Sequence, residues 1–140
     1  MKEQVIVTMP VHASEEAIWN IVKDPSGWET WFALIQHSSV DGAKRVCYTP
    51  QGELKETIEV IDERQKIFQY RIYEQRMLPI QDIVGTIQVT TSDVGETTVR
   101  WKAEFDPLDI ANVDEVKQTM RQLYRQAIEG LNKKASNTTV

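Results

Sequence analysis

The sequence has one cysteine, no basic run and no long hydrophobic segment, and each absence excludes a class of protein. Cys47 is alone, so neither an internal disulfide nor a cysteine-based zinc site can form. The net charge is −5 and the pI is about 5.1, which argues against nucleic acid as a partner. No apolar run approaches the roughly 20 residues that a membrane helix needs, so stable membrane insertion is not expected.

Sequence motifs for nucleotides and metals are also missing. Neither a GxGxxG nor a Walker pattern occurs, so nucleotide binding has no support. His12 and His37 belong to no HxH or HxxxH pair, so the sequence predicts neither a cofactor nor a metal site. The N-terminus alternates in polarity instead of forming the apolar core of a signal peptide, which favours a cytoplasmic protein.

The residues that are present fit one compact domain. The chain has 140 residues, and 41% of them are hydrophobic, which is enough to build a core. We expect a single domain over residues 1–134 and a flexible tail over 135–140. We expect the protein to be a monomer or a weak homodimer.

A long amphipathic helix is predicted near the end of the chain, from Asn112 to about Leu131. Its apolar residues recur in steps of three and four, which places them on one side of a helix. This stripe consists of Val113, Val116, Met120, Leu123, Tyr124, Ala127, Ile128 and Leu131. Asn112 and Glu115 have the spacing of a capping box. A helix with one apolar side must cover another apolar surface.

The residues before Asn112 are predicted to form mainly β-strands. Glu3 to His12 alternates between apolar and polar side chains, which is typical of a half-buried strand. Ser14 is expected to cap a helix that ends at Asp24-Pro25, and a second short helix is expected around Trp28.

From His37 onward, turn signals separate six further strands. Asp41-Gly42 predicts the first hairpin, and later turns leave strands at 43–49, 53–62, 66–76, 80–92 and 96–106. The predicted fold is therefore α+β, with a curved antiparallel sheet of about seven strands around the long C-terminal helix. A twisted sheet that grips the helix at one end can leave a ligand cavity elsewhere.

Several segments resemble the polyketide cyclase/dehydrase group of proteins. The matching segments are 13–19, Asp24-Pro25, Trp28, Trp31-Phe32, 52–56, 78–80 and 98–107. This group belongs to the START/Bet v 1-like (SRPBCC) helix-grip superfamily, whose members bind hydrophobic small molecules, as cyclases or as carriers of lipids, quinones or hormones. The resemblance covers nearly the whole chain. It implies a helix-grip fold, and it supplies no universal catalytic residue.

Residues at the expected gap between sheet and helix are the candidate ligand contacts. They are Trp28, Trp31, Phe32, Glu56, Tyr70, Ile83, Ile87, Trp101, Met120 and Tyr124. The tryptophans suit a cavity mouth because their amphipathic rings fit a boundary between apolar space and water. Packing of the short helices on the sheet explains them equally well. Met120 and Tyr124 would let a cavity wall adapt to a ligand, although core packing also accounts for them.

Glu56 is the best candidate for a catalytic or anchoring group. It alternates with Leu54 and Ile58, so the strand places its carboxylate on the apolar face. A carboxyl there would be a polar anchor or a general acid or base, or else half of a structural ion pair. Arg45 on the preceding strand is a possible partner, but the sequence leaves open which face Arg45 occupies. Asp82 is a weaker second carboxylate.

Three functions are compatible with these features. The first is binding of a small hydrophobic molecule that is lipid-, polyketide- or quinone-like, which requires only the cavity. The second is a cyclase or dehydratase that moves protons with Glu56 and with a tyrosine or histidine. The third is an interaction module like the Hsp90 co-activator domains. It has the least support, because no large apolar stripe remains once the core is assigned.

Overall fold

The computed structural model describes residues 2–137, which form one sheet, three short helical segments and one long helix. The elements are β1 (Glu3–Val11), α1 (Glu15–Val22), η1 (Trp28–Thr30), β2 (His37–Asp41), β3 (Lys44–Thr49), β4 (Gly52–Asp62), β5 (Ile67–Glu74), β6 (Ile80–Thr91), β7 (Thr97–Pro107), η2 (Ile110–Asn112) and α2 (Val113–Asn137). The predicted order of strand, two helices, six strands and long helix is confirmed. The predicted strand ends agree with the structure to within about two residues.

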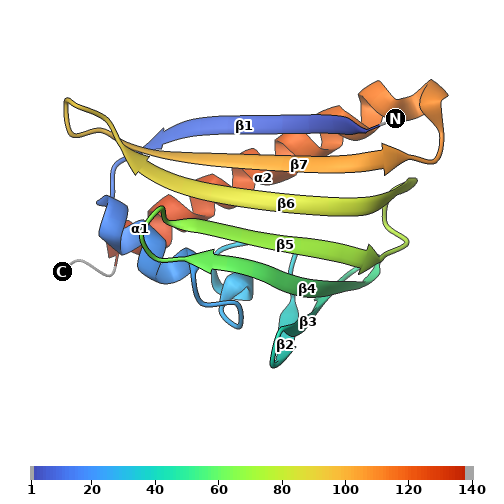
Figure 1. Cartoon of the computed structure of the whole chain (residues 1–140), viewed down its shortest axis with the longest axis horizontal. Coiled ribbons are helices and arrows are strands. Elements are labelled where there is room, and N and C mark those ends of the chain that lie inside the picture. The colour runs from blue at the N-terminus through green and yellow to red at the C-terminus, as the bar shows by residue number, and fades with distance from the viewer. Residues whose placement is uncertain (1, 138–140) are drawn as a thin grey trace.

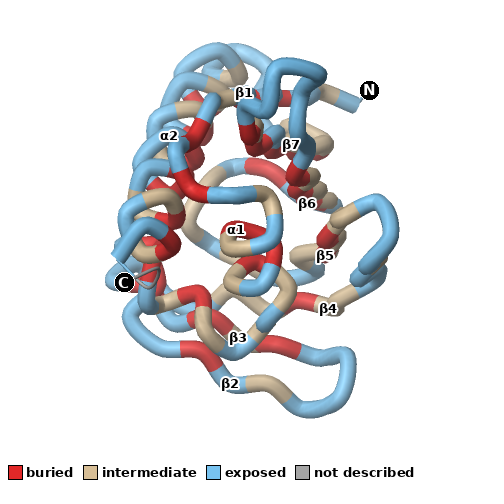
Figure 2. The backbone as a smooth tube through the Cα atoms, turned by 90° about the vertical axis from the view of Figure 1, so that its left-hand side faces the viewer, coloured by how far each residue is buried: buried red, intermediate tan, exposed pale blue. Residues whose placement is uncertain are grey.

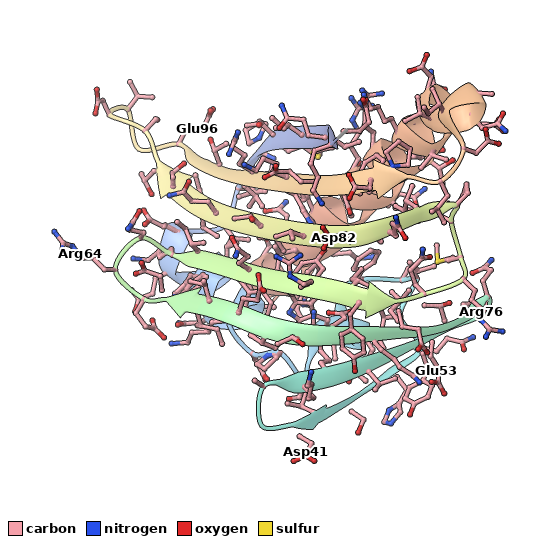
Figure 3. The ribbon with its side chains drawn as sticks, turned by 45° about the vertical axis from the view of Figure 1, so that its right-hand side comes forward. Asp41, Glu53, Arg64, Arg76, Asp82 and Glu96 are labelled. Carbon is pink, nitrogen blue, oxygen red and sulfur yellow. The ribbon has the colours of Figure 1, made fainter. Side chains whose placement is uncertain are left out.

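The seven strands form one antiparallel sheet in the order β1-β7-β6-β5-β4-β3-β2. Strands β2 to β7 are a meander, and β1 joins it by pairing along its whole length with β7. The sheet is curved, and α2 runs across its inner face with α1 at one end (Figure 1). This is the helix-grip fold that the sequence predicted. On the other face of the sheet, Asp82 is exposed to solvent (Figure 3) and pairs with the half-buried Arg71.

The helix starts are set by short polar side chains, though not always by the expected ones. Ser14 caps α1 as predicted, since its hydroxyl accepts from the amide of Ala17 at 3.1 Å. The second helix is only the single 3₁₀ turn η1. The predicted capping box at Asn112 was wrong, because the Asn112 side chain donates to Asp109 at 2.7 Å, and it is Asp109 that caps the short turn η2.

The long helix extends further than the apolar stripe predicted. α2 continues to Asn137, six residues beyond the expected end at Leu131, and Ala135 is fully buried within it. The expected tail over 135–140 therefore does not begin at Ala135, because the small side chain continues the buried stripe by one more turn. Residues 138–140 lie outside the described part of the chain.

Buried residues occur on the strands of the sheet and on α2 (Figure 2), and their side chains form one hydrophobic core. Two glycines allow the closest approaches. A methyl group at Gly85 on β6 would overlap the ring of Tyr70 from the neighbouring strand, and one at Gly130 on α2 would overlap the backbone carbonyl of Trp31. Glycine at these two positions lets an aromatic ring cross the sheet face and lets η1 pack directly on the helix.

Candidate functional site

The space between the sheet and α2 contains a small apolar cavity. Met120 and Tyr124 of α2 form one wall, and Tyr70 of β5 and Ile83 of β6 lie on the sheet side. The cavity volume is about 60 Å³, which is room for only a few water molecules. An engineered cavity that binds benzene measures roughly 150 Å³. The protein's own side chains thus fill most of the hollow that the fold predicts.

Seven of the lining residues are half-buried, and we call these residues the mouth of the cavity. They are Leu34, Leu54, Ile72, Gln75, Met77, Leu78 and Leu123. Gln75 organises the loop between β5 and β6. Its amide nitrogen donates to the carbonyls of Leu78 and Ile80, at 2.8 and 2.9 Å. Its oxygen accepts from the amides of Met77 and Leu78. These four hydrogen bonds saturate the side chain, which leaves the mouth apolar.

Arg45 and Glu56 form a buried ion pair beside the cavity. They lie directly opposite each other on β3 and β4, so the sheet directs both side chains to the inner face. Arg45 Nε and Nη2 both donate to Glu56 Oε1, at 3.0 and 2.6 Å, and the two side chains are 0% and 3% exposed. Arg45 Nη1 donates to the Pro25 carbonyl at 3.0 Å. The guanidinium also lies 4.0 Å from the ring centroid of Trp28, so η1 packs against the ion pair.

The electrostatics of this pair favour a structural role over free acid–base chemistry. Burial raises the pKa of the Glu56 carboxyl, and the charge and hydrogen bonds of Arg45 oppose that rise. A guanidinium keeps its charge in proteins, so protonating Glu56 would leave a buried, uncompensated cation. Burial and the nearby charge of Glu56 raise the pKa of the Cys47 thiol, which therefore remains neutral.

Three aromatic residues, from two strands and α2, contact one another beside the cavity. Trp101 Nε1 donates to the Tyr70 hydroxyl at 3.1 Å, and the Trp101 and Tyr124 rings stack with centroids 4.4 Å apart. The Tyr70 and Tyr124 hydroxyls are close enough to influence each other's pKa. Burial raises the pKa of both tyrosines, so both hydroxyls are neutral at physiological pH.

Seven of the ten predicted contact residues line the cavity. They are Trp28, Phe32, Glu56, Tyr70, Ile83, Met120 and Tyr124. Trp31, Ile87 and Trp101 are not in the lining and lie in the packed core. The aromatic residues do not form the mouth, because Trp28 turns inward and donates to the carbonyl of Val22 at 3.1 Å. The indole N–H of Trp31 is buried and, among the described residues, has no hydrogen-bond partner.

None of the seven mouth residues was among the ten predicted contact residues. Leu34 follows the aromatic segment, and the β5–β6 loop carries Met77 and Leu78, which the sequence marks only as a turn. Leu123 was predicted as part of the apolar stripe of the long helix, but not as a ligand contact. Apolar residues inside a predicted turn are the one signal that could have pointed to this loop, since turns are usually polar.

The remaining candidates lie away from the cavity. Asp82 is on the outer face of β6, where it pairs with Lys2 and Arg71 (Figure 3). His37 is exposed and stacks on Tyr48, and His12 is exposed at the end of β1. Within residues 2–137, no three histidine, cysteine or acidic side chains are grouped so that they could hold a metal ion. None of the helices described is both long enough and apolar enough to cross a membrane.

Comparison with known proteins identifies a family and the fold. The family model described as polyketide cyclase/dehydrase and lipid transport matches residues 2–136. No curated protein matches the chain. An uncharacterised protein from Bacillus thuringiensis superposes with a TM-score of 0.84 at 20% identity, over 95% of this chain and 98% of that one.

Two plant proteins also share the fold. Norcoclaurine synthase from Thalictrum flavum superposes with a TM-score of 0.75 at 14% identity, over 95% of this chain and 92% of that one. A major latex-like protein from Panax ginseng gives 0.81 at 15% identity, over 96% and 97% of the two chains. At such identities the similarity establishes the Bet v 1-like fold alone.

Proposed function

The chain belongs to the polyketide cyclase/dehydrase and lipid transport family, and from this premise we propose that it binds a small hydrophobic molecule between the sheet and α2. The molecule would be lipid-, polyketide- or quinone-like. The observation that carries this proposal is the apolar cavity with its apolar mouth. Binding sites for small molecules are concave and mostly apolar, with a few polar groups that orient the ligand, and Glu56 and two tyrosines fit that description.

Ligand binding must widen the cavity. Typical small-molecule sites enclose about 300–1,000 Å³, which is several times the volume of this one. The side chains that would move are the ones best suited to do so. Met77 at the mouth and Met120 in the wall are unbranched and flexible, and Leu123 is half-buried. The proposal is therefore a closed apo form that opens at the β5–β6 loop.

An enzymatic role has less support. A cyclase or dehydratase would need Glu56 as an acid or base, and Arg45 already engages that carboxylate with two hydrogen bonds. An interaction module has no supporting observation. Among the exposed large apolar side chains, Val94 lies in the turn between β6 and β7, whereas Leu108 and Ile110 lie in the short connection between β7 and α2. These few residues are too small a surface for a docking face.

Titration with toluene, a minimal apolar ligand, tests the binding proposal. The NMR signals of the Met77 and Met120 methyl groups should shift in a saturable manner, because both methionines line the cavity. Leu123→Trp places a larger side chain at the mouth and should weaken binding at least tenfold.

Val94→Trp is the matched control. It introduces the same side chain at the 91% exposed turn between β6 and β7 and should leave the affinity unchanged. If the wild type does not bind toluene, or if Leu123→Trp binds it as well as Val94→Trp, the cavity is not a binding site.

A further inference from the structure

We propose that the ligand carries a neutral hydroxyl group, as an alcohol or a phenol, and that this hydroxyl binds at Glu56. The inference rests on the proposed function and adds the chemical class of the ligand. It follows from the arrangement of charge around the cavity, where only one end of the Arg45–Glu56 pair is accessible.

Only the carboxylate of the ion pair lines the cavity. Glu56 belongs to the lining, and Arg45 does not. The guanidinium lies behind the carboxylate, against the Trp28 ring and the Pro25 carbonyl. Both hydrogen bonds from Arg45 end on Oε1. A carboxylate has about four lone-pair positions, so Glu56 keeps the capacity to accept a hydrogen bond from a ligand.

The net charge of the site disfavours charged ligand groups. A ligand carboxylate would face the Glu56 carboxylate across an apolar space, where like charges repel strongly. A ligand ammonium would be attracted to Glu56, but Arg45 already neutralises that charge. The ammonium would therefore be a buried, uncompensated cation, which costs several kcal/mol, roughly. A neutral group avoids both penalties.

A hydroxyl also suits the other polar groups of the cavity. The Tyr70 hydroxyl already accepts from Trp101, and Gln75 is saturated by its own loop. Glu56 can only accept from a ligand. The Tyr124 hydroxyl, in contrast, can donate or accept, and a ligand hydroxyl can donate and accept at the same time. An ether could not donate to Glu56, so it would leave the carboxylate without that partner.

Four probes that share a para-methylphenyl group distinguish a hydroxyl from an ether, a carboxylate and an ammonium. They are para-cresol, its methyl ether, para-toluate and para-methylbenzylammonium. Calorimetry and NMR at neutral pH should show that para-cresol binds about tenfold more tightly than the ether and more tightly still than either ion. Tightest binding of the toluate or the ammonium would overturn the inference, as would equal binding of cresol and ether. In those cases the cavity still binds ligands, whereas failure of all four probes and of toluene would reject the proposed function as well.

A double variant assigns the preference to Glu56. Arg45→Met combined with Glu56→Leu replaces both ends of the pair with apolar groups, which buried pairs often tolerate without loss of stability. In this variant the tenfold preference for cresol over the ether should disappear while the ether still binds. A preference that persists in the folded double variant would place the hydroxyl elsewhere. Glu56→Gln, which keeps an accepting oxygen, should retain a cresol preference of severalfold.

Discussion

The two halves of the interface between α2 and the sheet are built from the same helical stripe but packed differently. The half near α1, here called the closed half, uses Ala127, Ile128, Leu131 and Ala135, all of them almost fully buried. Asn132 joins this half to the end of β1 by accepting from the amides of His12 and Ala13. The other half, here called the cavity half, uses Val116, Met120, Leu123 and Tyr124, and it borders the cavity.

Side-chain size explains the difference. The closed half has two alanines and Gly130, so the helix approaches its neighbours until the Trp31 carbonyl contacts the glycine. In the cavity half, the larger side chains of Met120 and Tyr124 line a space that the surrounding side chains do not fill completely. The comparison shows that helical periodicity determines which face is buried, and that side-chain volume along the stripe determines where a cavity can form.

The largest effect is expected from removing one partner of the ion pair in the cavity half. Arg45→Met leaves Glu56 buried and unpaired, so the free energy of unfolding should fall by about 3–5 kcal/mol near neutral pH. Burial raises the pKa of Glu56. A carboxyl with a raised folded-state pKa costs stability above its unfolded value, and the cost vanishes as the pH falls below about 4.3. Urea unfolding of the variant at several pH values, monitored by tryptophan fluorescence, should therefore show stability that recovers in acid.

Arg45→Met combined with Glu56→Leu is the control for this prediction. It should regain most of the lost stability and lose the recovery in acid, because no buried carboxyl remains. If Arg45→Met alone is as stable as the wild type at neutral pH, the ion pair does not support the cavity half.

A large effect of another kind is expected in the closed half. Ile128 is fully buried, and Ile128→Ala should lower the free energy of unfolding by about 3 kcal/mol, since tight packing prevents the site from collapsing. Calorimetric unfolding measures this loss. Saturating toluene should not restore the midpoint, because removing three carbon atoms leaves much less space than the roughly 150 Å³ of a cavity that binds benzene. A rise in the midpoint with toluene would show that this half also opens.

A smaller loss is expected at the equivalent position of the cavity half. Met120→Ala should cost about 2 kcal/mol, because Met120 already borders empty space and loses fewer contacts. Here toluene should raise the midpoint of thermal unfolding, since the enlarged cavity binds it in the folded state only. Equal responses of Met120→Ala and Ile128→Ala to toluene would abolish the distinction between the two halves.

The smallest effect is expected on the sheet side of the cavity. Gly85→Ala introduces a methyl group that overlaps the Tyr70 ring, and the required shift should cost about 1 kcal/mol, at the low end for an overpacked core. The moved ring should weaken the hydrogen bond from Trp101 Nε1 to the Tyr70 hydroxyl. Faster solvent exchange of the Trp101 indole proton, measured by NMR, would report this change. An unaltered indole signal would mean that β6 moves instead of Tyr70.

Local patterns were sufficient to predict the architecture. Alternation, turn residues such as Asp41-Gly42 and the period of α2 produced all seven strands and the long helix. The position of Glu56 on the inner face also followed from alternation with Leu54 and Ile58. The errors concerned the two ends of the long helix. Asn112 was predicted to cap the helix, whereas Asp109 caps the preceding 3₁₀ turn. The helix was predicted to end at Leu131, but it continues beyond the buried Ala135.

The site was only partly predictable, because its boundary depends on contacts between distant segments. Trp31 and Trp101 belong to the packed core, while Met77 and Leu78 reach the mouth from a loop that the sequence presents as a turn. The face of Arg45 could not be decided from hairpin alternation. It follows from the register that places Arg45 opposite Glu56.

By itself the sequence determined the order of elements, their buried faces and the family, because each depends on residues near one another in the chain or on a pattern spread along it. The tertiary structure alone decided that Arg45 pairs with Glu56, and that the hollow between sheet and helix narrows to about 60 Å³. The reason is physical. Cavity volume and ion pairing are small differences among side chains brought together from separate strands and a helix, and no local pattern records how completely those side chains fill the space they share.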